Sequence, residues 1–169
     1  NYLAMTKTKL IFPDGFLWGA ATSSYQVEGG ITNNDWAVSD RVPKAGLACD
    51  HYHRYEEDFK LAKYLRHNAH RLSLEWSRLQ PQENRWNENE WQHYREVLIA
   101  LRAIGVEPLV TLNHFTLPLW LADKGGWTLM AARDYFAEFA KKAVEELGDL
   151  VTYWITINEP MILSLLSYY

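Results

Sequence analysis

The run Trp154-Ile155-Thr156-Ile157-Asn158-Glu159-Pro160 decides the fold that we expect for this chain. Its apolar, β-branched half has the length and composition of a buried strand. Pro160 has no backbone N–H to donate, and it disfavours helical dihedral angles at the residue before it. The run therefore predicts a strand that ends in two polar side chains, Asn158 and Glu159.

Three more apolar runs of strand length lie upstream, and helical patterns separate them. The expected strands are 16–20, 69–75, 106–112 and 151–157. The expected helices, in which apolar residues recur every three or four positions, are 54–67, 88–104 and 130–147. Asn87 is placed to cap the second of these helices and Gly105 to end it. Alternation of buried strands with helices predicts an α/β fold with a parallel sheet.

Two parallel architectures fit this order of elements, an open doubly wound sheet and a closed barrel. No Gly-x-Gly-x-x-Gly turn follows the first expected strand, which disfavours a dinucleotide-binding sheet. We therefore expect a (β/α)8 TIM barrel, of which 169 residues hold about the first four βα units, since a complete barrel takes about 250 residues. We expect 1–9 to be an N-terminal extension and 10–169 to be the N-terminal half of one truncated domain.

The charge balance limits the partners of the chain. With 17 basic and 21 acidic side chains the net charge is −4, and like charges form no block, so we expect no nucleic acid and no membrane partner. Neither an apolar window of about eighteen residues nor a secretory signal is present, so we expect a cytoplasmic protein. An aromatic content of 14% suits either an aromatic-rich core or rings that pack against sugar.

Reactive groups of a barrel lie at the carboxyl ends of its strands, so the polar residues there are the candidates for a site. They are Gln26, Glu28, Arg71, Glu75, Asn113, His114, Asn158 and Glu159. Carboxylates, amides and an imidazole suit reversible proton transfer to a neutral, polyhydroxylated substrate. The sequence has no phosphate-binding loop, serine elbow or zinc helix, and its only cysteine, Cys49, is expected to be a buried, inert thiol. We expect neither a metal nor an organic cofactor.

Glu159 is the strongest candidate for an acid. A carboxyl beside apolar and aromatic groups has its charged form desolvated, which raises its pKa toward the range where it gives a proton near neutral pH. A glycosidic oxygen needs such a general acid. On the residues alone, the alternative is that Asn158-Glu159-Pro160 begins a helix and carries an ordinary surface carboxylate.

Five motifs in order resemble the family-one glycoside hydrolases, the β-glucosidases, β-galactosidases and their relatives. They are 12–29, His51-Tyr52-His53-Arg54-Tyr55, 71–78, Thr111-Leu112-Asn113-His114-Phe115 and Thr156-Ile157-Asn158-Glu159-Pro160. The resemblance implies hydrolysis of O-glycosidic bonds by a retaining exo-β-glycosidase, most closely a β-glucosidase. Its substrate would be a β-glucoside or a related oligosaccharide or aryl glycoside.

The resemblance also implies roles for single residues. Glu159 would be the acid/base, Arg71 would support the nucleophile by keeping it ionised, and Asn158 would hold the sugar 2-hydroxyl. Gln26 and His114 would hydrogen-bond other hydroxyls. On the residues alone each of these side chains also fits a structural role. Two carboxylates stay open between a structural and a functional role, and three indoles are expected to pack in the barrel: Glu28 and Glu75, and Trp18, Trp76 and Trp120.

The chain departs from the family pattern in three places. Phe115 stands where many members have Trp, 32–48 lacks the expected Gly-Pro-Ser loop, and no Thr-Glu-Asn-Gly run carries a nucleophile. We therefore expect this fragment to be inactive alone. The unpaired edges of a half barrel should associate with the missing C-terminal half or with another copy. Two alternatives stay open: a noncatalytic sugar-binding or scaffold protein, and another Asn-Glu-Pro TIM-barrel glycosidase such as an endoglucanase.

Overall fold

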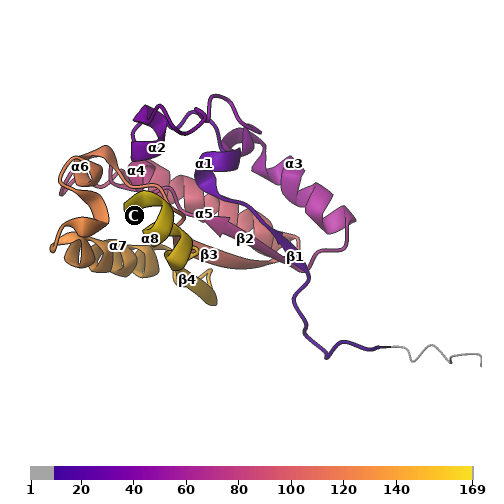
Figure 1. Ribbon diagram of the computed structural model, residues 1–169. Coiled ribbons are helices and arrows are strands. Elements are labelled where there is room, and N and C mark those ends of the chain that lie inside the picture. The colour runs from indigo at the N-terminus through magenta and orange to yellow at the C-terminus, as the bar shows by residue number, and fades with distance from the viewer. Residues whose placement is uncertain (1–9, 169) are drawn as a thin grey trace, which may run out of the picture.

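The core of the structure is a parallel sheet of four strands. The computed structural model describes residues 10–168, so the predicted N-terminal extension lies outside the described residues. The strands pair in sequence order and are β1 (Gly19–Ala21), β2 (Ala69–Ser73), β3 (Glu107–Asn113) and β4 (Tyr153–Ile157) (Figure 1). All three pairings are parallel, which confirms the predicted α/β arrangement.

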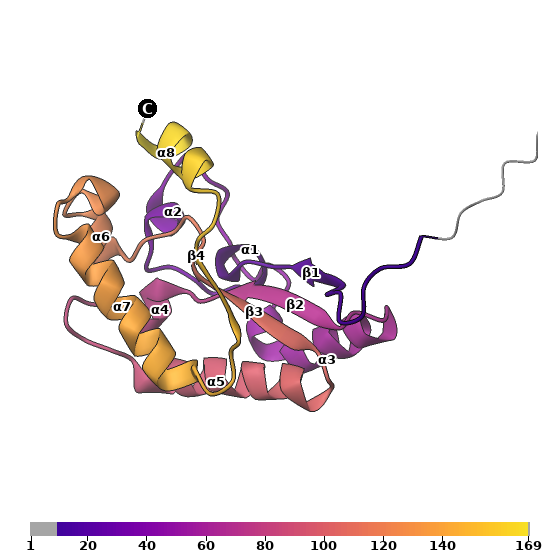
Figure 2. The ribbon, with the colours of Figure 1, turned by 90° about the horizontal axis from the view of Figure 1, so that it is seen from below.

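Three long helices cover one face of this sheet. They are α3 (His51–Tyr64), α5 (Glu88–Ala103) and α7 (Ala132–Leu147); in Figure 2, α3 and α5 lie below the strands and α7 lies to their left. One apolar cluster joins helices and sheet, with Leu72 and Val110 from the strands against Phe59, Leu98 and Phe139 from the helices. Burial of these side chains is the main force that holds the helices on the sheet.

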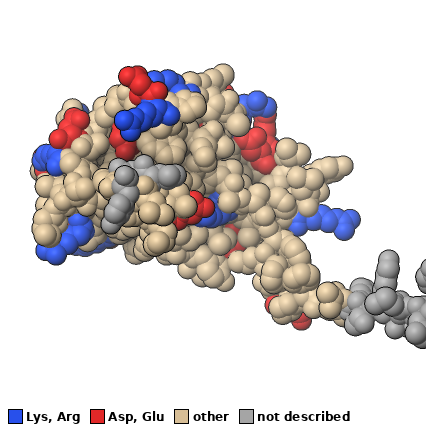
Figure 3. All heavy atoms as spheres, viewed as in Figure 1, with Lys and Arg blue, Asp and Glu red and all other residues tan. Residues whose placement is uncertain are grey.

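Short helices follow each strand at its carboxyl end. They are α1 (Ser24–Val27), α2 (Asp35–Val38), α4 (Trp76–Leu79), α6 (Leu119–Ala122), the 3-10 helix η1 (Gly126–Thr128) and α8 (Pro160–Tyr168). None of the described helices is long and apolar enough to cross a membrane. On the face shown in Figure 3, acidic and basic side chains are interspersed, as the charge pattern of the sequence suggests.

Strand β1 begins later than the sequence predicts, because a side chain takes the place of a neighbouring strand. The Trp18 amide donates to Asn68 Oδ1 at 2.6 Å, and Asn68 Nδ2 donates to the Phe16 carbonyl at 2.9 Å. The Trp18 carbonyl accepts from the Asn68 and Ala69 amides, and the ladder with β2 starts at Gly19, which is opposite Ala69. Trp18 is 48% exposed and contacts the rings of Phe12 and Phe16, so the prediction that it packs in the barrel is wrong for the described chain.

The other two tryptophans behave as predicted. Trp76 is buried and stacks on Phe139, and Trp120 packs against the core and against Trp76. The prediction for Cys49 is wrong, since its side chain is exposed. Cys49 lies in the surface segment before α3, where its backbone amide bonds to the Val27 carbonyl, so its backbone is held while its thiol faces solvent.

Helix ends agree with the sequence to within a few residues. Helix α5 starts after Asn87, whose side chain makes no capping hydrogen bond, and Gly105 has the predicted left-handed conformation with φ of 67°. Helix α3 starts and ends three residues earlier than expected. Arg66, with φ of 65°, cannot continue it.

Gly19 leaves no room for a side chain, which gives a test of the β1–β2 pairing. A Cβ atom there would lie 2.2 Å from the Ala69 carbonyl oxygen, so Gly19→Ala must push the two strands apart. We expect the substitution to lower the free energy of unfolding by about 1–3 kcal/mol, measured by urea denaturation. The matched control Ala20→Gly should cost less, about 0.5–1 kcal/mol. Equal stability of Gly19→Ala and the unsubstituted chain would contradict the pairing.

Candidate functional site

Side chains at the carboxyl ends of β2, β3 and β4 form one hydrogen-bonded group. Arg71 of β2 donates from Nε to Thr111 Oγ1 at 2.8 Å and from Nη2 to Asn158 Oδ1 at 2.7 Å. The Asn158 amide donates to the Asn113 carbonyl at 2.9 Å, which prolongs the β3–β4 pairing past the last strand residue. Asn158 is buried, and the hydrogen bond from Arg71 holds its carboxamide in place. Arg71, Asn113 and Asn158, which the sequence marks as candidates at strand ends, therefore lie together in the structure.

His114 follows β3 and is a neutral imidazole at pH 7. The ring is half-buried against Phe115, and its Nδ1 is buried with no hydrogen-bond partner among the described residues. Burial, and after it the positive charge of Arg71, lowers the pKa of His114 to about 4. A neutral ring offers one donor and one acceptor, which suits a hydroxyl group better than an ion.

An aromatic pair that the sequence did not reveal lies beside His114. Phe115 has a left-handed backbone, with φ of 73°, and stacks on Trp36 of α2 with ring centroids 5.6 Å apart. Asp35 holds the two segments together, since its carboxylate accepts from the Leu117 amide at 2.9 Å. The local signal for this turn is Asn34, whose side chain accepts from the Ala37 amide and caps α2.

Gln26 is exposed on α1 and lines the same cavity as Trp36. Its Oε1 accepts from the Ser23 hydroxyl at 2.6 Å. Its Nε2 amide group is left to donate to another partner. A cavity of about 300 Å³ is lined by Gln26, Tyr25, Trp36 and Pro43 among others. The structure therefore brings Gln26 near the aromatic pair and not into direct contact with Arg71 or Asn158.

Glu159 lies where β4 passes into α8, and here the sequence expectation needs correction. Its side chain is exposed, so the apolar enclosure expected around the carboxyl is absent from the described part of the chain. Its φ of 44° is left-handed, and Pro160 is the first residue of α8. Pro160 thus keeps Glu159 out of the helical conformation, as the sequence predicts. The Asn158-Glu159-Pro160 run also begins a helix and carries an exposed carboxyl group, which is what the alternative interpretation predicts.

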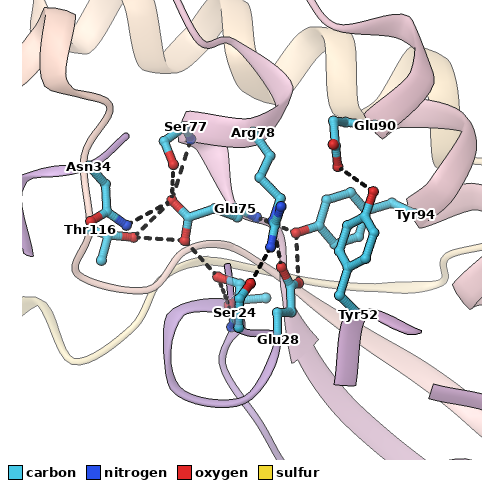
Figure 4. Close-up of polar contacts among 12 residues, drawn as sticks. Ser24, Glu28, Asn34, Tyr52, Glu75, Ser77, Arg78, Glu90, Tyr94 and Thr116 are labelled. Atoms are coloured by element: carbon cyan, nitrogen blue, oxygen red, sulfur yellow. Dashed lines mark hydrogen bonds and ion pairs between the residues drawn. The ribbon is translucent and has the colours of Figure 1, made fainter. Parts of the chain in front are cut away.

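Glu28 and Glu75 are both buried, and their carboxyl groups are hydrogen-bonded to other side chains of the chain (Figure 4). Glu28 accepts from the Tyr94 hydroxyl at 2.7 Å and from Arg78 Nε at 2.9 Å. Burial raises the pKa of Glu28 to about 7, although the charge of Arg78 opposes this shift. Glu75 accepts hydrogen bonds from four residues, Ser24, Asn34, Ser77 and Thr116. Residues 10–168 hold no group of three His, Cys, Asp or Glu placed to bind a metal.

The family model for glycosyl hydrolase family 1 matches residues 8–169. The chain is 37% identical over 175 residues to beta-glucosidase A of Acetivibrio thermocellus, covering 96% of this chain and 39% of that protein. It is 40% identical over 174 residues to the cytosolic beta-glucosidase of Homo sapiens, covering 94% of this chain and 37% of that protein.

A solved structure gives the same likeness in three dimensions. The beta-glycosidase from Pyrococcus horikoshii superposes with a TM-score of 0.87 at 42% identity, over 93% of this chain and 38% of that one. The match confirms the predicted fold class: the four parallel strands and their helices correspond to the N-terminal portion of a TIM barrel. The chain spans about two fifths of the length of the relatives that it matches.

The ionisation of His114 tests the geometry of the strand-end group. In an NMR titration of the ring protons, we expect a midpoint near pH 4. Arg71→Met removes a nearby positive charge, so the pKa of His114 should rise in that variant. A midpoint near the ordinary value of 6.5 in the unsubstituted chain would contradict the burial of the ring.

Proposed function

The chain belongs to glycosyl hydrolase family 1, and we propose that it supplies the acid/base half of a retaining exo-β-glycosidase that hydrolyses β-glucosides. The observation that carries the proposal is the hydrogen bond from Arg71 to Asn158, the residue directly before Glu159. It places a cation, a held carboxamide and a carboxylate-bearing residue at one edge of the sheet. Family membership also sets aside the alternative of an endoglucanase from another family.

In the proposed reaction Glu159 acts twice. It donates a proton to the glycosidic oxygen as the bond to the leaving group breaks, and it later takes a proton from the water that releases the sugar. A retaining enzyme needs a second carboxylate about 5 Å away as nucleophile. We propose that this carboxylate comes from the remaining part of the family domain, which would pair with the open edges of β1 and β4.

Arg71 is suited to keep that nucleophile ionised. Its Nε and Nη2 are engaged by Thr111 and Asn158, while Nη1 has no hydrogen-bond partner within residues 10–168. A guanidinium beside a carboxylate favours the charged form of the carboxylate. The remaining domain would also enclose Glu159, which is the condition for raising its pKa into the range of a proton donor.

The substrate we propose is a neutral β-glucoside, such as an oligosaccharide or an aryl glycoside. The relatives named beta-glucosidase support glucose as the sugar. Asn158 would hold the 2-hydroxyl, and Gln26 and neutral His114 would hydrogen-bond other hydroxyls. We propose no metal or organic cofactor, because proton transfer and a carboxylate nucleophile complete the reaction. A cytoplasmic location is supported by the name of the human relative.

The leaving group tests the role of Glu159. We expect the chain to be inactive alone and active when combined with the nucleophile-bearing part of a family member. In that complex Glu159→Gln should slow hydrolysis of an alkyl β-glucoside by roughly 10²- to 10⁴-fold. The loss in kcat/KM, which reports the first step, should be much smaller for 2,4-dinitrophenyl β-glucoside, because that leaving group departs without a proton.

Glu138→Gln is the matched control, since Glu138 is an exposed glutamate on α7, away from the strand ends. It should leave both rates unchanged. Equal losses for the two substrates in Glu159→Gln would contradict the proton-donor role. Hydrolysis by the isolated chain would contradict the external origin of the nucleophile. A complex that binds glucosides without hydrolysing them would favour the noncatalytic, sugar-binding alternative.

A further inference from the structure

The two loops that carry the proposed sugar-binding residues, after β1 and after β3, converge on one carboxylate, that of Glu75 (Figure 4). Glu75 stands just after β2, and its relative exposure is 0%. A side chain so deeply buried cannot touch a substrate. It nevertheless lies beneath the residues that are expected to do so.

Each loop donates a hydrogen bond to Glu75. Ser24 Oγ donates to Oε2 at 3.0 Å, and Asn34 Nδ2 donates to Oε1 at 3.2 Å. Thr116 Oγ1 lies 3.3 and 3.4 Å from the two carboxylate oxygens. A fourth donor, Ser77 Oγ at 2.6 Å, comes from α4, which continues directly from Glu75.

Each donor from a loop is close in sequence to a residue of the candidate site. Ser24 lies on the same turn of α1 as Gln26, and Asn34 caps the helix that carries Trp36. Thr116 closes a tight turn with His114, since the Thr116 amide donates to the His114 carbonyl at 3.0 Å. The position of Glu75 is thereby linked to three residues from two loops.

The burial of Glu75 makes this link stronger than its distances alone suggest. No Lys or Arg within the described residues forms an ion pair with Glu75, and Arg78 nearby is paired with Glu28. A buried carboxylate without a cation is stabilised only by the hydrogen bonds that it accepts. The loops must therefore keep their donors on Glu75, and any loop that moves away leaves a buried carboxyl oxygen without its hydrogen bond.

We propose that Glu75 is a positioning residue that holds the loops bearing Gln26, Trp36 and His114 in the arrangement that a sugar requires. This inference rests on the proposed function, because it gives a purpose to the placement of sugar-binding residues. A purely structural carboxylate would contribute to stability without controlling where His114 lies.

Two substitutions that each remove a hydrogen-bond donor to Glu75 distinguish the positioning role from a role in stability alone. Thr116→Val and Ser77→Ala each remove one hydroxyl donor to Glu75, but only Thr116 lies in a loop of the site. The hydrogen bond lost from Ser77 is the shorter one. If Glu75 contributes to stability alone, Ser77→Ala should therefore lower the free energy of unfolding more than Thr116→Val does. A positioning role predicts that His114 responds to Thr116→Val and not to Ser77→Ala.

The readout is the NMR titration of His114 in the 169-residue chain. In Glu75→Gln and Thr116→Val we expect the midpoint to rise by roughly one unit or more, because a displaced ring gains solvent. Loss of a negative charge at Glu75 by itself would not raise the midpoint, so a rise reports movement. Glu28→Gln is a second control, since it alters another buried carboxyl group that receives no bond from the His114 loop.

Hydrolysis by the complex with the nucleophile-bearing part then separates the two proposals. Glu75→Gln should raise KM for an aryl β-glucoside roughly tenfold and change kcat less, since the affected residues bind hydroxyls throughout the reaction. Hydrolysis by the unsubstituted complex, with His114 and KM unchanged in Glu75→Gln and Thr116→Val, would overturn the role of Glu75. A shift of His114 in a complex that hydrolyses no glycoside would support the link to the loops and overturn the proposed function. If Glu75→Gln fails to fold, the titration midpoint of His114 in Thr116→Val, compared with that in Ser77→Ala, decides between the positioning role and a role in stability alone.

Discussion

The hydrogen bond from Arg71 to Asn158 depends on the parallel pairing of β2, β3 and β4, and the candidate site depends on that bond. The two residues are 87 positions apart and come from strands that do not touch each other. Only the intervening strand β3, with Thr111 beneath the guanidinium, brings them within 2.7 Å. Parallel strands point all their carboxyl ends to one edge, so polar residues scattered along the chain become neighbours there.

A second constraint acts at the same edge, in the loops rather than the strands. Glu75 draws donors from the loops after β1 and β3, and Asp35 fastens the same two loops to each other. Burial raises the pKa of Asp35 to about 6. The strands thus fix where the candidate site residues leave the sheet, while buried carboxyl groups hold the loops that surround them.

Local patterns were sufficient for much of the fold and only for part of the site. The strand before Glu159, the helix over 88–104 and the left-handed Gly105 follow from periodicity and from residue conformation, which are local properties. Strand β1 was misplaced because the partner of Trp18 is the Asn68 side chain, 50 residues away. The stacking of Trp36 on Phe115 and the convergence on Glu75 are also long-range contacts, and no spacing along the sequence encodes them. Glu159 is exposed within residues 10–168. The enclosure of a carboxyl group at a strand end depends on the elements packed around it, which its local sequence does not specify.

The central claim is that this edge of the sheet binds a β-glycoside with Glu159 at its glycosidic oxygen. The most direct measurement is a crystal structure of the chain with the nucleophile-bearing part of a family member and a nonhydrolysable β-glucoside. We predict the Glu159 carboxyl within hydrogen-bond distance of the glycosidic heteroatom, about 3 Å, and Asn158 on the 2-hydroxyl. A sugar bound with Glu159 turned away from the glycosidic bond, or bound on another face of the chain, would contradict the account.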